Sequence, residues 1–139
     1  MAQAEFKSDV EEMGDRAVRH VNAKGITGIV LAGHPYHLDP VVNHGIPELI
    51  NGHNVAVLTE DSVAGRSRGM ETGADLKVID QWVFHSRLYR AASAVARDPE
   101  LRRFELVQLN SFGCGLDAIS ADQTAGLLER EGRMHTLLS

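Results

Sequence analysis

The fold is decided by the stretch ITGIVLAGHPYH, residues 26–37, in which an apolar run gives way abruptly to a polar segment. Residues 26–32 are rich in β-branched side chains and are bounded by glycines, which predicts a short strand buried on both faces. Pro35 ends this strand, because proline lacks an N–H and holds the preceding residue, His34, in an extended conformation. We therefore expect a parallel strand whose carboxyl end carries His34, Tyr36 and His37.

The chain alternates such apolar runs with amphipathic segments. Further strands are expected at residues 55–58, 104–109 and 134–138, and helices at residues 6–24, 46–52, 78–96 and 120–131. This alternation indicates parallel strands joined by crossover helices. We therefore predict an α/β fold: a three-layer, Rossmann-like domain with a short, four-stranded, mainly parallel sheet in the order 2-1-3-4 and helices on both faces.

One apolar stripe and two capping boxes refine the expected helices. The first helix is expected to place its apolar residues on one face, namely Phe6, Val10, Met13, Ala17 and Val21. A capping box of Ser8 with Glu11 fits its start, and Gly25 fits its end. Ser120 with Gln123 forms a second capping box, which places the expected start of the last helix near residue 120.

The composition argues against several classes of protein. The 139-residue chain has a formal net charge of −5 and no cluster of Lys and Arg, so we expect no nucleic-acid partner. No apolar run approaches the roughly 18 residues that span a bilayer, so we expect no membrane partner. The single cysteine, Cys114, fits a reducing, cytoplasmic compartment. Residues 1–139 suit one α/β domain, and the abrupt apolar ending leads us to expect a domain excised from a longer multidomain chain.

The unusual polar residues gather at one edge of the predicted sheet. Ligands of open parallel sheets bind at the carboxyl ends of the strands, near the switch in strand order. That edge would be formed by residues 33–37, 59–62 and 110–115. The candidate binding residues there are His34, Tyr36, His37, Gly113, Cys114 and Gly115. Arg66 and Arg68, in the long loop that follows, are candidates for holding an anion, although the loop matches no nucleotide-binding motif.

Cys114 has three interpretations. It lies between Gly113 and Gly115 directly after a strand, which permits a tight turn and the close approach of another group. A helix N-terminus favours thiolate over thiol, so Cys114 could act as a nucleophile or as a ligand of a metal cluster. Alternatively, it is a small buried apolar residue, as free cysteines commonly are.

The histidines after the first strand have two interpretations. His34, His37 and His44 could bind a metal, since neutral imidazole is a ligand of zinc and iron. Their spacing matches no helical zinc motif, however, and the chain has no second cysteine. The alternative is that these histidines and Tyr36 cap or bridge the loop backbone. Asp117 is expected either to accept a hydrogen bond near the turn or simply to stabilise the turn.

The helix predicted at residues 78–96 carries two further pairs of interest. His85 and Tyr89 lie on its apolar stripe, and we expect them at the edge of the core with their polar tips hydrogen-bonded. Arg87 and Arg90 are expected on a solvated face. Neither pair is assigned a chemical role.

Several ordered motifs carry a resemblance to a known family. They are LAGHPYHLDP at residues 31–40, NHGIPEL at 43–49, LTEDS at 58–62, DQW at 80–82 with HSRLYR at 85–90, and QLNSFGCGLDA at 108–118. From about residue 26 to its end, the chain resembles the large activator-type homologues of (R)-2-hydroxyglutaryl-CoA dehydratase, also described as CoA-substrate-specific enzyme activases. The similar part is the non-ATPase region between their ATPase modules and their dehydratase-like region.

The resemblance implies a role in ATP-driven electron transfer. In that family, ATP hydrolysis pushes an electron from an iron–sulfur cluster onto a dehydratase, whose [4Fe-4S] clusters are bound by cysteines from separate segments. By this resemblance Cys114 is a cluster ligand in the parent protein. The other ligands would come from the ATPase modules, from the dehydratase-like region, or from a second copy in a homodimer. The chain has no phosphate loop, so we expect no ATPase activity from it alone.

Three hypotheses for the function stay open at this stage. The first is a domain that contributes a cluster ligand or a docking surface to an electron-transfer activase and is inactive alone. The second is a small cysteine-dependent enzyme with His34 or His37 as the base. The third is a purely structural module.

Overall fold

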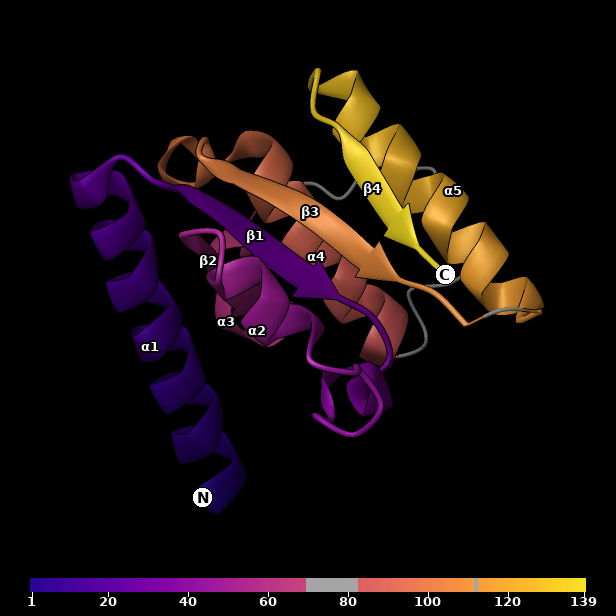
Figure 1. The fold of residues 1–139 in the computed structure, drawn as a ribbon, viewed down its shortest axis with the longest axis horizontal. Helices are drawn as coiled ribbons and strands as arrows, with labels where there is room; N and C mark the ends of the chain where they lie inside the picture. The colour runs from indigo at the N-terminus through magenta and orange to yellow at the C-terminus, as the bar shows by residue number, and fades with distance from the viewer. Residues whose placement is uncertain (70–82, 112) are drawn as a thin grey trace.

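The structure is a computed structural model that describes residues 1–69, 83–111 and 113–139. Its centre is a four-stranded, all-parallel sheet in the order β2-β1-β3-β4 (Figure 1). The strands are β1 (Thr27–Ala32), β2 (Val55–Thr59), β3 (Phe104–Leu109) and β4 (His135–Leu138). The predicted α/β class and strand order are confirmed. Short apolar runs rich in β-branched residues are typical of strands, which is why the sequence predicted the sheet.

The central strand β1 packs on both of its faces. Val30 pairs with Leu106 of β3 and belongs to the larger core, whereas Leu31 pairs with Val107 and belongs to a smaller cluster on the opposite face. This division follows from the period of two along a strand. Val30 and Leu31 are 0% and 1% exposed, so the prediction of a strand buried on both faces is confirmed.

Helices and short 3-10 turns surround the sheet. They are α1 (Ala2–Lys24), η1 (Pro35–Leu38), α2 (Ile46–Asn51), α3 (Glu60–Val63), η2 (Ala64–Ser67), α4 (Val83–Arg97), η4 (Pro99–Leu101) and α5 (Gly115–Arg130). The larger core takes residues from α1, α3, α4 and α5. On the opposite face, Ile46 of α2 packs against the smaller cluster. The two helical layers are therefore unequal.

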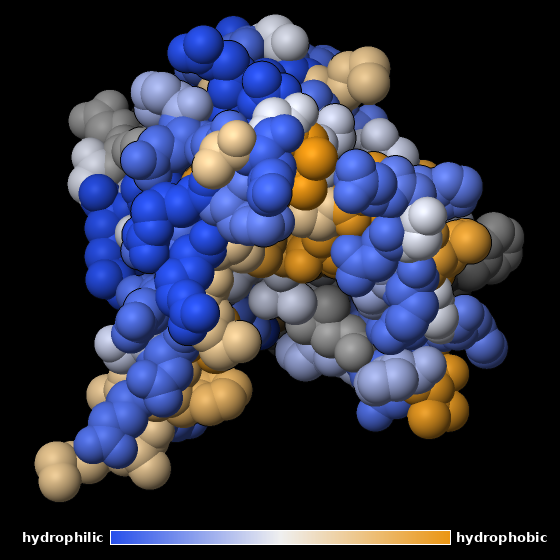
Figure 2. Space-filling model, turned by 60° about the vertical axis from the view of Figure 1, so that its left-hand side comes forward, coloured by the Kyte–Doolittle hydropathy of each residue, from blue (hydrophilic) through white to orange (hydrophobic). Residues whose placement is uncertain are grey.

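The first helix begins earlier than predicted and turns a different face inward. α1 starts at Ala2, and no side chain caps it, so the capping box expected at Ser8 is not used. Phe6 and Met13, which were expected on the buried stripe, are 70% and 67% exposed. The amino-terminal end of α1 projects from the rest of the molecule with hydrophobic residues on its surface (Figures 1 and 2).

Gly14 explains which face of α1 is buried. A Cβ at this position would lie 2.3 Å from the carbonyl oxygen of Ser62, so the glycine allows α1 to pack closely against α3. Val18 and Val21 follow on the same face and are fully buried. The close approach at Gly14, which hydrophobic periodicity does not register, thus sets the rotation of α1. The helix ends as predicted at Gly25, whose φ of 66° is left-handed.

The last helix also begins earlier than predicted. α5 starts at Gly115 with Cys114 as its N-cap, and Ser120 lies inside the helix. The Ser120 hydroxyl is buried and donates to the carbonyl oxygen of Asp117 at 3.0 Å. A serine inside a helix can make this bond to the preceding turn instead of capping the helix start, so the capping-box prediction was wrong.

The connection after β2 was predicted as a long loop, but α3 and η2 occupy its described part. The helix expected from residue 78 is present as α4 from Val83 onwards, and residues 70–82 lie outside the described residues. Within residues 1–69, 83–111 and 113–139, no helix combines the length and apolar character that a bilayer crossing requires.

Candidate functional site

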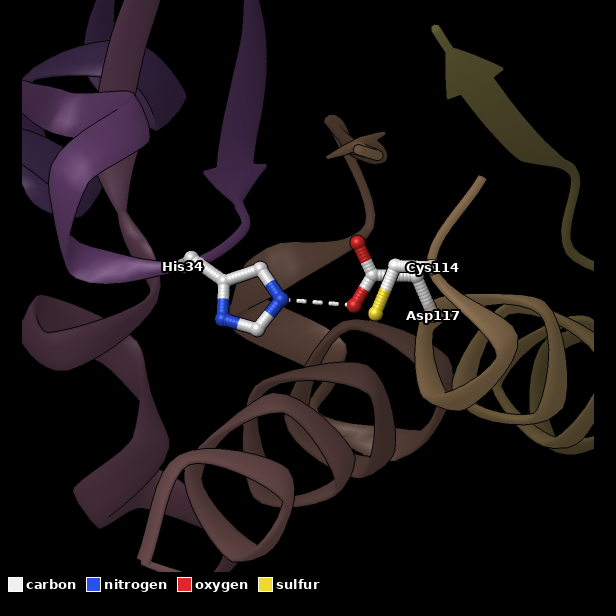
Figure 3. A group of neighbouring side chains, drawn as sticks. All are labelled: His34, Cys114 and Asp117. Carbon is white, nitrogen blue, oxygen red and sulfur yellow. Dashed lines mark hydrogen bonds and ion pairs between the residues drawn. The ribbon is translucent and has the colours of Figure 1, made fainter. Parts of the chain in front are cut away.

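Three side chains meet at the carboxyl edge of the sheet, and we call them the edge cluster: His34, Cys114 and Asp117. His34 follows β1, Cys114 is the N-cap of α5, and Asp117 lies in the first turn of α5. Nε2 of His34 is 2.6 Å from Oδ1 of Asp117, and one ligand atom of each residue lies within 4.8 Å of the other two (Figure 3). The strand topology therefore brings together residues that are far apart in the sequence.

Asp117 is a buried carboxylate that is held in its charged form. Its side chain is 2% exposed, and burial by itself would raise its pKa. The N–H of Ser111 donates to Oδ2 at 2.8 Å, and His34 and the Cys114 thiol also favour the charged form, so the pKa of Asp117 is lowered overall. The prediction that Asp117 accepts a hydrogen bond at this turn is confirmed.

The imidazole of His34 is fixed in position by two aromatic rings. It stacks on Tyr36 with a centroid distance of 5.0 Å and an interplanar angle of 6°. It also stacks on Phe84 of α4 at 4.3 Å and 16°. Stacking on both neighbours limits the rotation of the ring, so Nε2 stays directed at Asp117 and Cys114 (Figure 3).

His37 supports the loop rather than the edge cluster. Its Nδ1 accepts the backbone N–H of His34 at 3.1 Å, so Nε2 must carry the proton of the neutral ring and can donate to Ser111 Oγ at 3.3 Å. The hydroxyl of Tyr36 is 2.7 Å from the same Ser111 oxygen. Burial and the proximity of His34 lower the pKa of His37, which favours this neutral form. His37 and Tyr36 thus bridge the loop, which was one of the two predicted alternatives.

Two exposed glycines flank Cys114. Cys114 is partly exposed, and its neighbours Gly113 and Gly115 are exposed. A Cβ on either glycine would meet no heavy atom within 4 Å among the described residues outside its own neighbourhood. Gly113 has a φ of 83°, a left-handed conformation that glycine adopts without strain. The described residues therefore leave open space at the turn on both sides of Cys114.

Glu60 is a functional candidate that the residue-by-residue reasoning missed. It follows β2 at the same edge, is 2% exposed, and accepts the N–H of Gly33 at 3.4 Å. Burial raises the pKa of Glu60 to about 8, against the lowering effect of Arg87, whose Nε is 3.6 Å away. Arg87 also pairs with Asp61 at 2.9 Å, so its predicted role on a solvated face is corrected. Only its position in segment 59–62 pointed to Glu60.

The structure also corrects the predicted anion site. Arg66 contacts three carboxylates, those of Asp15 at 2.7 Å, Asp98 at 2.9 Å and Glu100 at 2.6 Å. Arg68 pairs with Glu11 at 2.6 Å. Both guanidinium groups are therefore already neutralised by acidic side chains. The sequence could not predict these ion pairs, because the acidic partners lie on other elements.

The remaining candidates lie away from the edge cluster or in the core. His44 is exposed in the turn before α2 and is not part of the group. His85 and Tyr89 are each 2% exposed, so they lie within the core and not at its edge. The hydroxyl of Tyr89 donates to Gln123 at 2.6 Å, as predicted for its polar tip. Arg90 is exposed, as predicted.

The three side chains of the edge cluster place their possible ligand atoms close to one another. In a nucleophilic relay, one imidazole nitrogen faces the nucleophile and the other faces the carboxylate. Here the same end of the His34 ring faces both Asp117 and Cys114 (Figure 3). Such convergence suits a group bound between nitrogen, sulfur and oxygen better than a proton relay from the thiol.

Comparison with known proteins gives one match. No significant match was found among curated proteins or among solved structures. Residues 1–63, which include His34, Tyr36, His37 and Glu60 but not Cys114, match the family model described as "CoA enzyme activase uncharacterised domain" (DUF2229). The amino-terminal part of the chain is therefore similar to a domain of CoA enzyme activases.

Proposed function

We propose that this chain is a domain of an activase-type iron–sulfur protein related to the activators of 2-hydroxyacyl-CoA dehydratases. In this proposal it contributes Cys114 as a cluster ligand, together with the surface around it, to ATP-driven electron transfer, and it is inactive alone. The observation that carries the proposal is the position of Cys114. Cys114 is partly exposed and is the N-cap residue of α5, at the same sheet edge as residues 33–37, which lie within the activase match.

This chain can supply one of the ligands of a cluster but not the complete set. A [4Fe-4S] cluster is ordinarily held by four cysteine thiolates, and this chain has one cysteine. The open space beside Gly113 and Gly115 is what a bulky inorganic group bound at Cys114 requires. The other ligands would come from the ATPase modules, from the dehydratase-like region, or from a second copy of the chain. When bound, the cluster would supply one-electron chemistry.

The residues around Cys114 then have defined tasks. Cys114 is the N-cap residue of α5, so the first turn of the helix fixes the position of its side chain. Asp117 and the stacked His34 hold the first turn of α5 against the loop after β1. The site thereby presents the thiolate from a rigid sheet edge.

Thiol catalysis is less well supported as the function. A base for Cys114 needs a free imidazole lone pair near the sulfur. In His37, the backbone N–H of His34 occupies Nδ1, and Nε2 carries the proton. In His34, the nitrogen nearest the sulfur is engaged by Asp117 at 2.6 Å.

The test is anaerobic reconstitution with iron and sulfide in the presence of a small monothiol, which can supply the missing thiolates. The wild-type chain is expected to take up iron and sulfide in proportion to protein, with the sulfur-to-iron charge-transfer absorbance of a cluster. Cys114→Ser is expected to lose both signals. Absence of iron from the wild type, or equal uptake by Cys114→Ser, would contradict the proposal.

A further inference from the structure

The edge cluster has the composition of a site for a single metal ion. It offers an imidazole nitrogen, a thiol sulfur and a carboxylate oxygen, and these three atoms lie within 4.8 Å of one another. The geometry points to a mononuclear site for a divalent cation of the zinc class, bound by Nε2 of His34, Sγ of Cys114 and an oxygen of Asp117. This inference goes beyond the proposed function, because the chain holds such an ion alone and shares only Cys114 with the cluster.

The donor set selects the class of cation. Hard cations such as magnesium and calcium require oxygen ligands, and softer ions prefer several sulfurs. A mixture of one nitrogen, one sulfur and one oxygen is typical of zinc and of cobalt(II), which accept all three atoms. An ionised carboxylate and a thiolate together also balance the charge of a divalent ion.

Only a small movement is needed to admit the ion. In a tetrahedral site with bonds of about 2.0–2.3 Å, ligand atoms are about 3.3–3.7 Å apart. The three atoms already lie within 4.8 Å of one another, and the pair formed by His34 and Asp117 must open from 2.6 Å. In this movement the ion replaces the hydrogen bond between imidazole and carboxylate. The neutral ring then carries its proton on Nδ1 instead of Nε2, and the proton of the Cys114 thiol is released to the solvent.

Neighbouring groups hold the ligands in place, as in established metal sites. The N–H of Ser111 donates to Oδ2 of Asp117 at 2.8 Å and leaves Oδ1 for the ion. Tyr36 and Phe84 hold the ring of His34 from both faces. Oriented ligands of this kind lose little freedom on binding, which favours affinity.

The turn around Cys114 leaves room for a fourth ligand. Cys114 is partly exposed, and the glycines on either side carry no side chain that would cover it. Three protein ligands with a fourth, accessible position is the pattern of zinc sites that bind water or an exchangeable ligand. The same opening is where an external thiolate or a cluster iron would reach the sulfur, so a cluster and a single ion would exclude each other.

The test is anaerobic titration of the reduced chain with cobalt(II), followed by displacement with zinc. The wild type is expected to bind one equivalent of cobalt, with visible bands of tetrahedral coordination and a near-ultraviolet thiolate-to-cobalt band. Cys114→Ser should lose the thiolate band, and His34→Gln and Asp117→Asn should each weaken binding by about tenfold or more. His53→Gln, which changes an exposed histidine, is the matched control and should bind as the wild type does.

The variants also separate this inference from the proposed function. Serine is a favoured N-cap, so Cys114→Ser should fold even if Asp117→Asn does not. His34→Gln should lose cobalt while keeping uptake of iron and sulfide, which needs Cys114 alone from this chain. Failure of the wild type to bind cobalt, a bound form without the thiolate band, or an unchanged affinity in a correctly folded His34→Gln would overturn the inference, whatever the result with iron.

Discussion

Two regions of this molecule carry residues that were predicted to bind a ligand, but they differ in what they leave available. Around Arg66, the carboxylates of Asp15, Asp98 and Glu100 lie within 2.6–2.9 Å of the guanidinium, and the Arg66 side chain is 14% exposed. In the edge cluster, Cys114 is partly exposed between two glycines with open space among the described residues, and the three ligand atoms lie within 4.8 Å of one another. We call the Arg66 cluster closed, because its charges are already paired, and the edge cluster open, because the residues around Cys114 leave room for a ligand.

The difference shows that charge density alone does not mark a functional site. Arg66 makes strong charge-assisted hydrogen bonds that tie η2 to α1 and to the residues before β3, so its charges stabilise the fold. In the edge cluster, His34 and the Cys114 thiol both contact Asp117, and Cys114 is partly exposed. Substitutions should therefore affect stability at the Arg66 cluster and ligand binding at the edge cluster.

Arg66→Met should have the largest effect on stability. It leaves Asp98, whose side chain is 14% exposed, without its cation, while Asp15 and Glu100 are more exposed and lose less. We expect the free energy of unfolding to fall by about 2 kcal/mol, measured by urea denaturation. Arg90→Met, at an exposed position on α4, should change it by less than about 0.5 kcal/mol. Equal losses in the two variants would show that the Arg66 cluster is not closed in the sense described.

Glu60 should make the edge region lose stability as the pH rises. Its pKa of about 8 in the folded state exceeds the value of about 4.3 for an unfolded chain, so the native state binds the extra proton. The stabilisation is complete below the unfolded pKa and is lost as the pH rises towards 8. Between about pH 6.5 and 8, we expect the free energy of unfolding of the wild type, taken relative to that of Glu60→Gln, to fall by about 1 kcal/mol per pH unit.

Comparison with the variant isolates this effect. The pKa values of His37, His85 and His135 are lowered, mainly by burial, so their contributions grow with pH and are nearly complete only above about pH 7.5. The wild type and Glu60→Gln share these contributions, but Glu60→Gln keeps the neutral form at every pH, so urea denaturation of Glu60→Gln should show no fall in stability from pH 6.5 to 8. A wild-type slope retained in Glu60→Gln would assign the pH dependence to another group.

Cys114→Ser should have the smallest effect on stability. Cys114 is partly exposed, and serine is a favoured N-cap for α5, so the free energy of unfolding should change by less than about 0.5 kcal/mol. The measurement is urea denaturation of the metal-free chain. A loss above about 2 kcal/mol would instead identify Cys114 as a buried core residue, which was the third interpretation of its position.

The sheet could be predicted from the sequence because its strands are local signals. Residues 26–32 and 104–109 are short apolar runs with clear ends, and their order follows from general rules for parallel sheets. The buried face of α1 and the first residues of α1 and α5 could not be predicted from the sequence. Gly14 rotates α1 through a contact with Ser62, and Ser120 bonds back to Asp117 where a cap was expected. Both outcomes depend on contacts that periodicity does not contain.

The candidate site was predictable only in outline. Strand order places residues 33–37 and 110–115 at the same edge, so the proximity of His34 and Cys114 follows from the topology. The tautomer of His37, the burial of Glu60 and the neutralisation of Arg66 depend on partners from other elements. Tertiary contacts decide whether a charged side chain is paired or free, and the sequence does not show these contacts.

The most direct test of the central claim moves the cysteine from the edge cluster to another surface. Met13 lies on α1 and is 67% exposed, so a thiol there is accessible but lacks the sheet edge. Iron and sulfide content after anaerobic reconstitution is compared for the wild type, Cys114→Ser, and Cys114→Ser combined with Met13→Cys. We predict uptake in the wild type only. Full restoration of uptake by Met13→Cys would contradict the claim, because any exposed thiol would then suffice.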